Sequence, residues 1–405
     1  MSKDDEPRQA TLSIWGGEEG LRIAGATQVP VVSSVAFGYD DLDHWRDVAL
    51  GNAEGDIYSR NTNPTVRVFE EKIRLLEGAE AATSFSTGMA AISATLFALL
   101  KPGDRVVSVK DTYGGTNRLF LDYVPRVGID VKLCDTSDQD RILAEIEAGC
   151  QLVYLETPTN PTCKIMDIEL LARRAKAQGA VVVVDNTFAT PINQNPLTLG
   201  ADLVVHSATK YLGGHADALG GALCGSAELV ARVFAYREVN GATLHPDSAY
   251  MLLRGMKTLQ LRIERQNANA MEVARFLDAH DLVEHVFYPG LPGHANHDVA
   301  RRQMRGFGGM LSFQLKGGFE TVKDFAPRLR FAHRAANLGA VETTVAPPRT
   351  GSHVELTEQE RAAMGIPEAL VRYSAGIEDS RDLLADLDQA LTYAAKRHTK
   401  HLAPT

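Results

Sequence analysis

VVVVDNTFATPINQNPLTLGADLVVHSATKYLGGHADALGG, residues 181–221, is the stretch that decides the fold of this chain. It holds two apolar runs, 181–184 and 203–205, and Asp185 and Lys210 follow them within a few residues. Burial raises the free energy of both charged side chains, so a chain that places them at the ends of buried strands gains something specific from them. The stretch therefore predicts a functional site at one edge of a sheet.

Similar short apolar runs lie earlier in the chain. RVVSV, IDVKL and LVYLE occupy residues 105–109, 129–133 and 152–156, and helix-length segments at 138–148 and 167–178 separate them. Strands that alternate with helices in this way form a parallel sheet with both faces covered. The fold class is therefore predicted as α/β, with a mostly parallel sheet covered by helices.

The length of the chain predicts more than one packed region. A chain of 405 residues exceeds the size at which a single hydrophobic core keeps growing. Residues 1–60 lack strong periodicity and include an acidic stretch, so they are expected to form an N-terminal arm or a long ordered loop. We expect a larger α/β domain over 61–248 and a smaller C-terminal α/β domain over 249–405.

Helical periodicity marks several segments. Apolar residues at three- and four-residue spacing predict a helix over about 65–77, and an almost wholly apolar segment predicts a buried helix that begins near residue 88. A long helical stretch follows at 250–280, and the last helix is expected from about residue 378. No internal repeat interrupts this order.

Composition and charge exclude several classes of protein. Hydrophobic residues make up 44% and charged residues 23% of the chain, and a net charge of −9 opposes binding to nucleic acid. No apolar run is long enough for a membrane span, and the polar N-terminus lacks the apolar core of a signal peptide. The cysteines lack the spacing of a metal site, so we expect reduced thiols, no metal and a cytoplasmic protein.

Chemically useful side chains follow the predicted strands. Ligands of open α/β sheets bind beyond the carboxyl ends of the strands, so these residues are candidates for one site. In chain order they are Tyr113, Asn160, Asp185, Ser207, Thr209 and Lys210. Alone, each has an ordinary explanation as a turn, cap or loop residue, but independent accidents rarely fall on one edge of one sheet.

Together these residues describe a pyridoxal phosphate site. Lys210 can form an imine with an aldehyde, and Asp185 can keep a pyridine nitrogen protonated so that the ring accepts electrons. Tyr113 would stack on that ring. The phosphate would be held by the backbone at Gly88 and Met89, where the buried helix begins, and by the hydroxyls of Ser207 and Thr209.

At this point the chain resembles a known family, the γ-subfamily of Cys/Met-metabolism pyridoxal phosphate enzymes. The matching stretches are YSRNTNPT (58–65), SFSTGMAA (84–91), DTYGGTNRLF (111–120), ETPTNP (156–161), VVVVDNTFATP (181–191), HSATKYLGGHAD (206–217), LLRGMKTL (252–259), MRGFGGMLSF (304–313) and LVRYSAGIED (370–379). The resemblance implies the transferase fold type I of pyridoxal phosphate enzymes. It makes 61–248 the cofactor-binding domain.

The resemblance also implies roles for individual residues. Lys210 looks like the Schiff-base lysine, Asp185 the partner of the ring nitrogen, and Tyr113 the stacking ring and an acid for the leaving group. Tyr58 and Arg60 match residues that reach the cofactor phosphate of a neighbouring subunit, which implies active sites shared between two subunits and a homotetramer. Residues that match substrate-binding positions are Asn160, Glu342, Thr343 and Arg372.

The implied reaction is γ-elimination or γ-replacement on a γ-substituted, homoserine-type L-amino acid. Methionine γ-lyases carry a cysteine where this chain has Gly115, which disfavours methionine as the substrate. Glu342 matches a residue near a distal substrate amine, which favours a substrate with a cationic tail. The segment 342–353 and the acidic arm depart from the family pattern, which favours a lyase for a cationic substrate such as canavanine. Cystathionine γ-synthase and O-acylhomoserine sulfhydrylase remain alternatives. Two hypotheses from other functional classes also stay open: a binding protein that has lost catalysis and an aminotransferase of the same fold.

Overall fold

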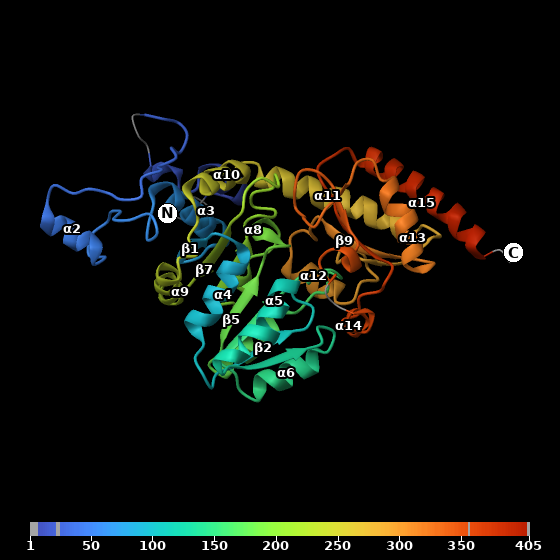
Figure 1. The fold of residues 1–405 in the computed structure, drawn as a ribbon, viewed down its shortest axis with the longest axis horizontal. Helices are drawn as coiled ribbons and strands as arrows, with labels where there is room; N and C mark the ends of the chain where they lie inside the picture. Colours follow the sequence, from blue (N-terminus) through green and yellow to red (C-terminus); the bar gives the residue numbers. More distant parts are fainter. Residues whose placement is uncertain (1–6, 22–24, 355–356, 403–405) are drawn as a thin grey trace.

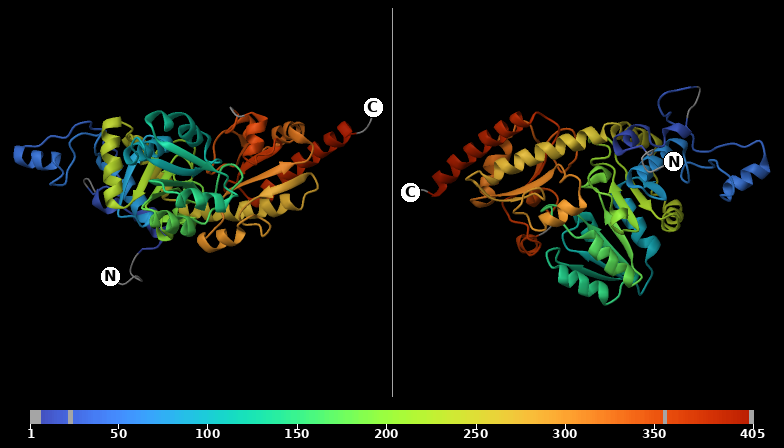
Figure 2. Two further views of the ribbon diagram at one scale, coloured as in Figure 1. Left: turned by 90° about the horizontal axis from the view of Figure 1, so that it is seen from below. Right: turned by 180° about the vertical axis from the view of Figure 1, so that it is seen from behind.

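A computed structural model describes residues 7–21, 25–354 and 357–402 of the chain. Two β-sheets, each covered by helices, lie side by side along the long axis of the molecule, and the long helix α11 (Leu259–Asp278) runs from one to the other (Figures 1 and 2). An N-terminal segment that carries α2 (Leu42–Ala49) projects from the end opposite the C-terminus. No helix in the described part of the chain has the length and hydropathy to cross a membrane.

The larger sheet has seven strands in the order β1-β7-β6-β5-β4-β2-β3. All neighbours pair in parallel except β7, which is antiparallel to both β1 and β6, so the predicted mostly parallel sheet is confirmed. The strands are β1 (Ala81–Phe85), β2 (Arg105–Val109), β3 (Asp130–Cys134), β4 (Leu152–Glu156), β5 (Val181–Asp185), β6 (Leu203–Ser207) and β7 (Gly221–Gly225).

Both faces of this sheet are buried, which explains the run of four valines. Side chains alternate along a strand, so Val183 packs with α4 and α9 while Val182 and Val184 pack with α6 and α7 on the opposite face. Burial of each valine contributes roughly 1.5–3 kcal/mol relative to exposure. The helices of this region are α3 (Pro64–Glu77), α4 (Gly88–Leu99), α5 (Gly114–Arg118), α6 (Gln139–Glu147), α7 (Ile168–Ala177), α8 (Thr190–Asn193), α9 (Ala227–Asn240) and α10 (Pro246–Met256).

Local signals set the ends of these helices. Asn63 caps α3 by accepting the backbone N–H groups of Thr65 and Val66, and Gly78 ends it with φ of 69°. The helices predicted over 65–77 and from residue 88 are thus confirmed. The stretch predicted as helical over 250–280 is two helices, because α10 ends at Met256 and α11 begins at Leu259.

The smaller sheet has five strands in the order β10-β11-β12-β9-β8 and lies in the C-terminal part of the chain. Its strands are β8 (Val283–Phe287), β9 (Met310–Leu315), β10 (His333–Arg334), β11 (Thr344–Ala346) and β12 (Leu370–Ser374). The helices that follow α11 are α12 (His297–Gln303), α13 (Gly318–Phe325), α14 (Glu358–Ala363) and α15 (Ser380–Leu402). Short helical turns occur at 18–20, 119–123, 125–127, 196–199, 326–328 and 348–350.

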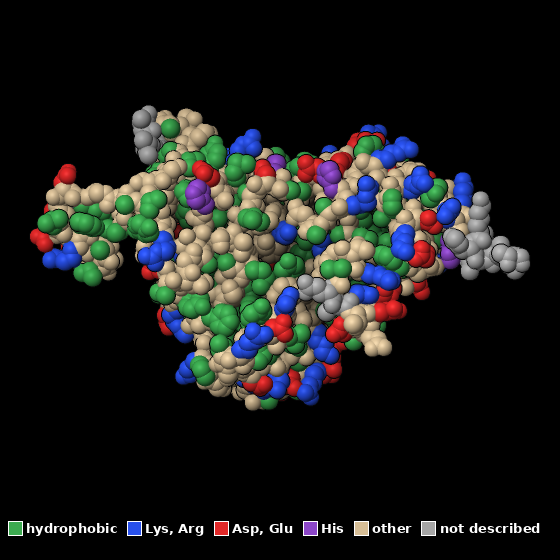
Figure 3. Space-filling view, in the orientation of Figure 1, with side chains coloured by type: hydrophobic (Ala, Val, Ile, Leu, Met, Phe, Trp, Pro, Cys, Tyr) green, Lys and Arg blue, Asp and Glu red, His purple; other side chains and the backbone are tan. Residues whose placement is uncertain are grey.

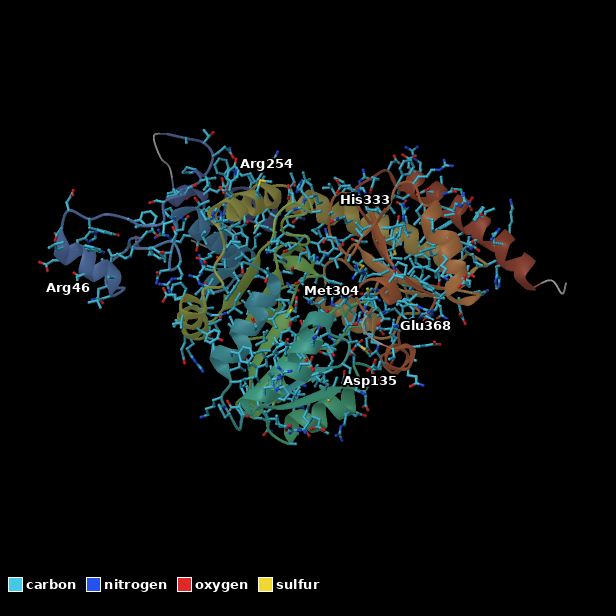
Figure 4. The ribbon with its side chains drawn as sticks, in the orientation of Figure 1. Arg46, Asp135, Arg254, Met304, His333 and Glu368 are labelled. Atoms are coloured by element: carbon cyan, nitrogen blue, oxygen red, sulfur yellow. The ribbon has the colours of Figure 1, made fainter. Side chains whose placement is uncertain are left out.

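The N-terminal segment has one anchored and one projecting part. Helix α1 (Gln9–Trp15) is held against α3 by Lys72, whose buried Nζ donates to the carbonyl oxygen of Ile14 at 2.9 Å and to Glu18 Oε1 at 2.7 Å. The projecting part, residues 30–60, exposes apolar side chains (Figure 3), among them Leu42, which is 72% exposed. Arg46 marks its helix α2 in Figure 4, well away from the sheets, and this helix was not predicted from the sequence.

Candidate active site

The carboxyl ends of neighbouring strands bring the predicted residues of the large domain together. Glu156 and Asp185 end β4 and β5 and are paired in register, and Ser207 ends the next strand, β6. Lys210 lies in the turn directly after β6, where its backbone N–H donates to Ser207 O at 3.1 Å. One edge of the sheet therefore carries carboxylate, hydroxyl and amine groups within a few residues of each strand end.

The amine of Lys210 is held in a partly buried position. Its Nζ donates to Asn337 Oδ1 at 2.8 Å, so a loop of the C-terminal part of the chain reaches the edge of the large sheet. Burial, and then the positive charge of Arg372, lower the pKa of Lys210 from 10.5 to about 8. A lysine with this pKa is partly neutral near physiological pH and can act as a nucleophile or a proton acceptor.

Asp185 is buried and fixed by two hydrogen bonds. Its Oδ1 accepts the backbone N–H of Thr187 at 2.9 Å, and its Oδ2 accepts the hydroxyl of Tyr154 at 3.2 Å. Burial raises the pKa of Asp185, and its hydrogen bonds together with the nearby His206 oppose that rise. A buried carboxylate in this setting gains from a protonated ring nitrogen placed against it.

The start of α4 and the end of β6 form a cradle for an anion. The first turn of a helix leaves backbone N–H groups without intrahelical partners, and here that turn begins at Gly88 and Met89. A Cβ at Gly88 would lie 2.7 Å from the Cβ of Ser207, so only glycine permits this approach. The Thr209 hydroxyl accepts the N–H of Gly220 at 3.1 Å, which fixes it in the same turn as Lys210.

Tyr113 stands at the mouth of this edge, directly before α5. Its side chain is 46% exposed, while its backbone N–H donates to Glu156 Oε2 at 2.8 Å. A Cβ at Gly115 would lie 2.9 Å from the Tyr113 ring and 3.0 Å from Met89 Sδ. The absence of a side chain at Gly115 therefore allows the Tyr113 ring to approach Met89 at the start of α4.

Arg372 provides a buried positive charge beside Lys210. Its Nη1 donates to Asn160 Oδ1 at 3.1 Å and its Nη2 donates to the carbonyl oxygen of Asn337 at 3.2 Å. Both acceptors are neutral oxygens, and burial lowers the pKa of Arg372 from its ordinary value. A guanidinium in this position is well placed to bind a carboxylate through a forked pair of hydrogen bonds.

The other two predicted substrate residues, Glu342 and Thr343, make no hydrogen bond to Lys210, Arg372 or Asn337 in the described part of the chain. Glu342 is exposed, and Thr343 donates its backbone N–H and its hydroxyl to Glu378, at 2.7 Å and 2.9 Å. Thr343 therefore has no free donor for a substrate carboxylate. The residue of this loop that enters the cluster is Asn337, which sequence reasoning missed because the loop is irregular and turns through Gly339, with φ of 77°.

Tyr58 and Arg60 lie at the base of the projecting segment. The Arg60 side chain lies over the Tyr58 ring, and its Nη1 donates to the carbonyl oxygen of Glu238, in α9, at 2.6 Å. Ser59, between them, hydrogen-bonds to the preceding part of the segment: its hydroxyl donates to Ser34 O and its N–H donates to Val35 O. These contacts connect the two residues to α9 and the arm, not to the Lys210 cluster of the same chain.

The residues present fit pyridoxal phosphate. The glycine-dependent cradle between Gly88 and Ser207 suits a phosphate, the amine of Lys210 suits its aldehyde, and the buried carboxylate of Asp185 suits its ring nitrogen. Within residues 7–21, 25–354 and 357–402, no group of His, Cys, Asp or Glu side chains could hold a metal ion.

Comparisons with known proteins agree with this fit. The profile of the family described as Cys/Met metabolism PLP-dependent enzyme matches residues 10–392. The chain is 44% identical to an L-methionine gamma-lyase of Fusobacterium nucleatum subsp. polymorphum, over 91% of this chain and 94% of that protein. It is 41% identical to a cystathionine gamma-lyase of Bacillus subtilis, over 95% and 99% of the two chains.

A solved structure gives the same result. Cystathionine gamma synthase from Xanthomonas oryzae pv. oryzae, in complex with aminoacrylate and cysteine, superposes with a TM-score of 0.91 at 39% identity, over 96% of this chain and 99% of that one. These likenesses confirm the predicted fold type I and the predicted cofactor. The chain belongs to the Cys/Met-metabolism family of pyridoxal phosphate-dependent enzymes.

Proposed function

We propose that this enzyme breaks the bond between Cγ and a heteroatom of a γ-substituted L-amino acid, and that elimination is favoured over replacement. The observation that carries the proposal is that Lys210 and Arg372 both contact Asn337. Lys210 is partly buried and donates to the side chain of Asn337, whereas Arg372 is buried and donates to its backbone carbonyl oxygen. A substrate held by its carboxylate on Arg372 would present its α-carbon near the lysine amine.

The chain's own groups divide the work. Arg372 and Asn160 bind and orient the α-carboxylate, and Asp185 holds a proton at the ring nitrogen of the cofactor. Bound pyridoxal phosphate supplies the electron sink for the charge that develops at the α-carbon. Lys210, whose pKa is lowered to about 8, would take the α-proton, release it, and then take a proton from Cβ. Loss of that β-proton would expel the γ-substituent. Tyr113, at the mouth of the site, is placed to protonate the group that leaves Cγ.

We propose canavanine as the first substrate to test. The projecting segment carries Asp40, Asp41 and Asp43, all exposed, so that it adds negative charge beyond Tyr58. In the shared active site proposed below, this charge would lie near the Lys210 cluster of a neighbouring subunit and would attract a guanidinium-bearing substrate. Glu342 is exposed and remains a second candidate contact for a cationic substrate tail.

The second candidate function is replacement, as in a cystathionine γ-synthase. The TM-score of 0.91 with a cystathionine gamma synthase favours it. The same residues of this chain support both outcomes once the γ-substituent has left. In replacement an incoming thiol adds at Cγ, whereas in elimination a 2-oxo acid and ammonia form. The two functions are therefore distinguished by their products and by their requirement for a thiol.

The test is turnover of the purified holoenzyme with each of a set of γ-substituted amino acids. Canavanine, cystathionine, O-acetylhomoserine, O-succinylhomoserine and methionine are each assayed with and without cysteine, and 2-oxobutyrate, homoserine and cystathionine are measured. Product from canavanine alone supports the lyase for a cationic substrate. Cystathionine formed only from an O-acylhomoserine and cysteine supports the synthase and ends the canavanine proposal.

We also propose that two chains share each active site, within a homotetramer. The contacts of Arg60 with α9 and the exposed apolar side chains of the projecting segment support a role for Tyr58 and Arg60 in a neighbouring subunit. A mixing experiment tests this: Lys210→Ala and Arg60→Ala are each expected to be inactive alone. Unfolded and refolded together, they should regain activity, because a mixed dimer has one site with both residues intact. Activity that never returns on mixing would argue against shared sites.

The proposed compartment is the cytoplasm. Its support is the state of the cysteines, which are all buried free thiols in the structure. Reduced thiols persist in the cytosol, where disulfides are rare. Fractionation of cells that express the native gene tests this proposal.

A further inference from the structure

Glu156 is a buried carboxyl group at the active edge to which neither the sequence nor the proposed mechanism assigns a role. It ends β4, is 5% exposed, and is paired in register with Asp185 on β5. Its position in the sheet is therefore fixed by the backbone ladder on the side that carries the partner of the ring nitrogen. Buried carboxyl groups are retained where they satisfy specific donors.

Glu156 lies against the backbone of two other active-site residues. Its Oε2 accepts the backbone N–H of Tyr113 at 2.8 Å, and the nearby backbone N–H of Asn160 lowers the pKa of the same carboxyl group. Tyr113 follows β2 and Asn160 follows β4, so one side chain joins the loops at the ends of two neighbouring strands.

The two loops need such a link because each carries a side chain that must be placed accurately. The backbone at Tyr113 has φ of −48° and ψ of 138°, and its side chain makes no capping hydrogen bond to α5. Its carbonyl oxygen accepts the N–H of Asn117 in α5 at 2.9 Å, whereas its own N–H is held by Glu156. Asn160 presents its Oδ1 to Arg372 at 3.1 Å. Burial and the Asp185 carboxylate raise the pKa of Glu156, whereas the two N–H donors oppose the rise.

We propose that Glu156 is a positioning residue that fixes the separation between the Tyr113 ring and the Asn160 amide. It touches neither substrate nor cofactor and acts through the two backbone N–H groups. The ring that covers the cofactor and the amide that meets Arg372 and the substrate carboxylate thereby stay in register. The inference rests on the roles proposed above for Tyr113 and Asn160.

The test compares three variants of the holoenzyme. Glu156→Ala removes both acceptors, and Glu156→Gln keeps one carbonyl oxygen. The matched control is Glu145→Gln, because Glu145 is 8% exposed, lies in α6 of the same domain and pairs with Arg105, which begins β2 at the opposite edge of the sheet. For each variant we would measure kcat, KM for the amino-acid substrate and the visible circular dichroism of the bound cofactor.

Glu156→Ala is expected to lower kcat/KM by about 10- to 100-fold, since a displacement of about 1 Å has that cost, and to divide the loss between a lower kcat and a higher KM. The circular dichroism band of the bound cofactor should change with it. Glu156→Gln should be intermediate, and Glu145→Gln should leave kcat, KM and the band unchanged. If Glu156→Ala does not fold, the comparison of Glu156→Gln with Glu145→Gln decides the question.

The inference would be overturned if Glu156→Gln had the same kinetics and the same circular dichroism band as Glu145→Gln. It would also be overturned if Glu156→Ala matched the unaltered enzyme in both measurements. Tyr113→Ala, measured alongside, separates it from the proposal on which it rests. If Tyr113→Ala leaves the band unchanged, the stacking role of Tyr113 is wrong. If Tyr113→Ala changes the band and Glu156→Ala does not, Tyr113 keeps its role and Glu156 loses the one inferred here.

Discussion

Replacement of Lys210 by methionine should stabilise the cofactor-free protein at neutral pH. In the folded chain, burial and then Arg372 lower the pKa of Lys210 from 10.5 to about 8. A difference of one pH unit is worth about 1.4 kcal/mol, so charging the buried amine costs about 3 kcal/mol below pH 8. Methionine has a similar length and pays no such cost, although it loses the hydrogen bond to Asn337, worth about 1 kcal/mol.

The pH dependence gives this prediction its sign. Because the folded pKa lies below the unfolded one, the stability contributed by neutral Lys210 is complete above pH 10.5 and is lost as the pH falls toward 8. Lys210→Met should therefore exceed the unaltered protein by about 2 kcal/mol at pH 7, and its advantage should shrink steadily between pH 8 and pH 10.

The assay is urea unfolding of both cofactor-free proteins at several pH values, followed by far-ultraviolet circular dichroism. Asn337→Ala serves as the control, because it removes the same hydrogen bond and keeps the amine. A difference between Lys210→Met and the unaltered protein that does not vary with pH would refute the reasoning. A difference that grows as the pH rises would refute it as well.

Three further predictions concern the site. Arg372→Lys should raise KM for the amino-acid substrate by about 10- to 100-fold with a smaller effect on kcat, because lysine cannot form the forked pair of hydrogen bonds with a carboxylate. Initial rates at several substrate concentrations measure both constants. Asp185→Asn should leave the cofactor bound but lower kcat by at least about 100-fold, because an amide cannot keep the ring nitrogen protonated; absorbance and turnover on one sample check both parts. Thr87→Ala removes the acceptor for the N–H of Ala90 and should cost about 1 kcal/mol of stability, measured by urea unfolding.

Much of the large domain follows from hydrophobic pattern alone. The valines at 181–184 predict a strand buried on both faces, and Val183 and Val184 do face opposite layers. Strands β1 and β7 were not predicted, since GALCG at 221–225 is short and rich in small residues and gains its place only by pairing between β1 and β6. Helix α2 was missed although Leu42, Trp45 and Val48 lie at helical spacing, because its capping residue Asp41 is one of several carboxylates in the acidic arm and does not stand out as a helix start.

The site divides in the same way. Lys210 and Asp185 could be predicted because each follows directly from a strand whose direction the sequence reveals. Asn337 could not, since its loop belongs to the other sheet and reaches Lys210 across more than a hundred residues of chain. Glu378, which occupies both donors of Thr343, is equally remote from any strand end of the large sheet. Contacts between the two parts of the chain are what sequence patterns leave undetermined.

The covalent attachment of the cofactor tests the central claim most directly. The yellow holoenzyme is reduced with borohydride, digested and analysed by mass spectrometry, with Lys164, Lys257 and Lys316 as internal comparisons in the same digest. The account predicts a pyridoxyl phosphate group on Lys210 alone and a Lys210→Ala protein that takes up no reducible cofactor. Modification of a different lysine, or of none, would contradict the assignment of the active edge to β4, β5 and β6.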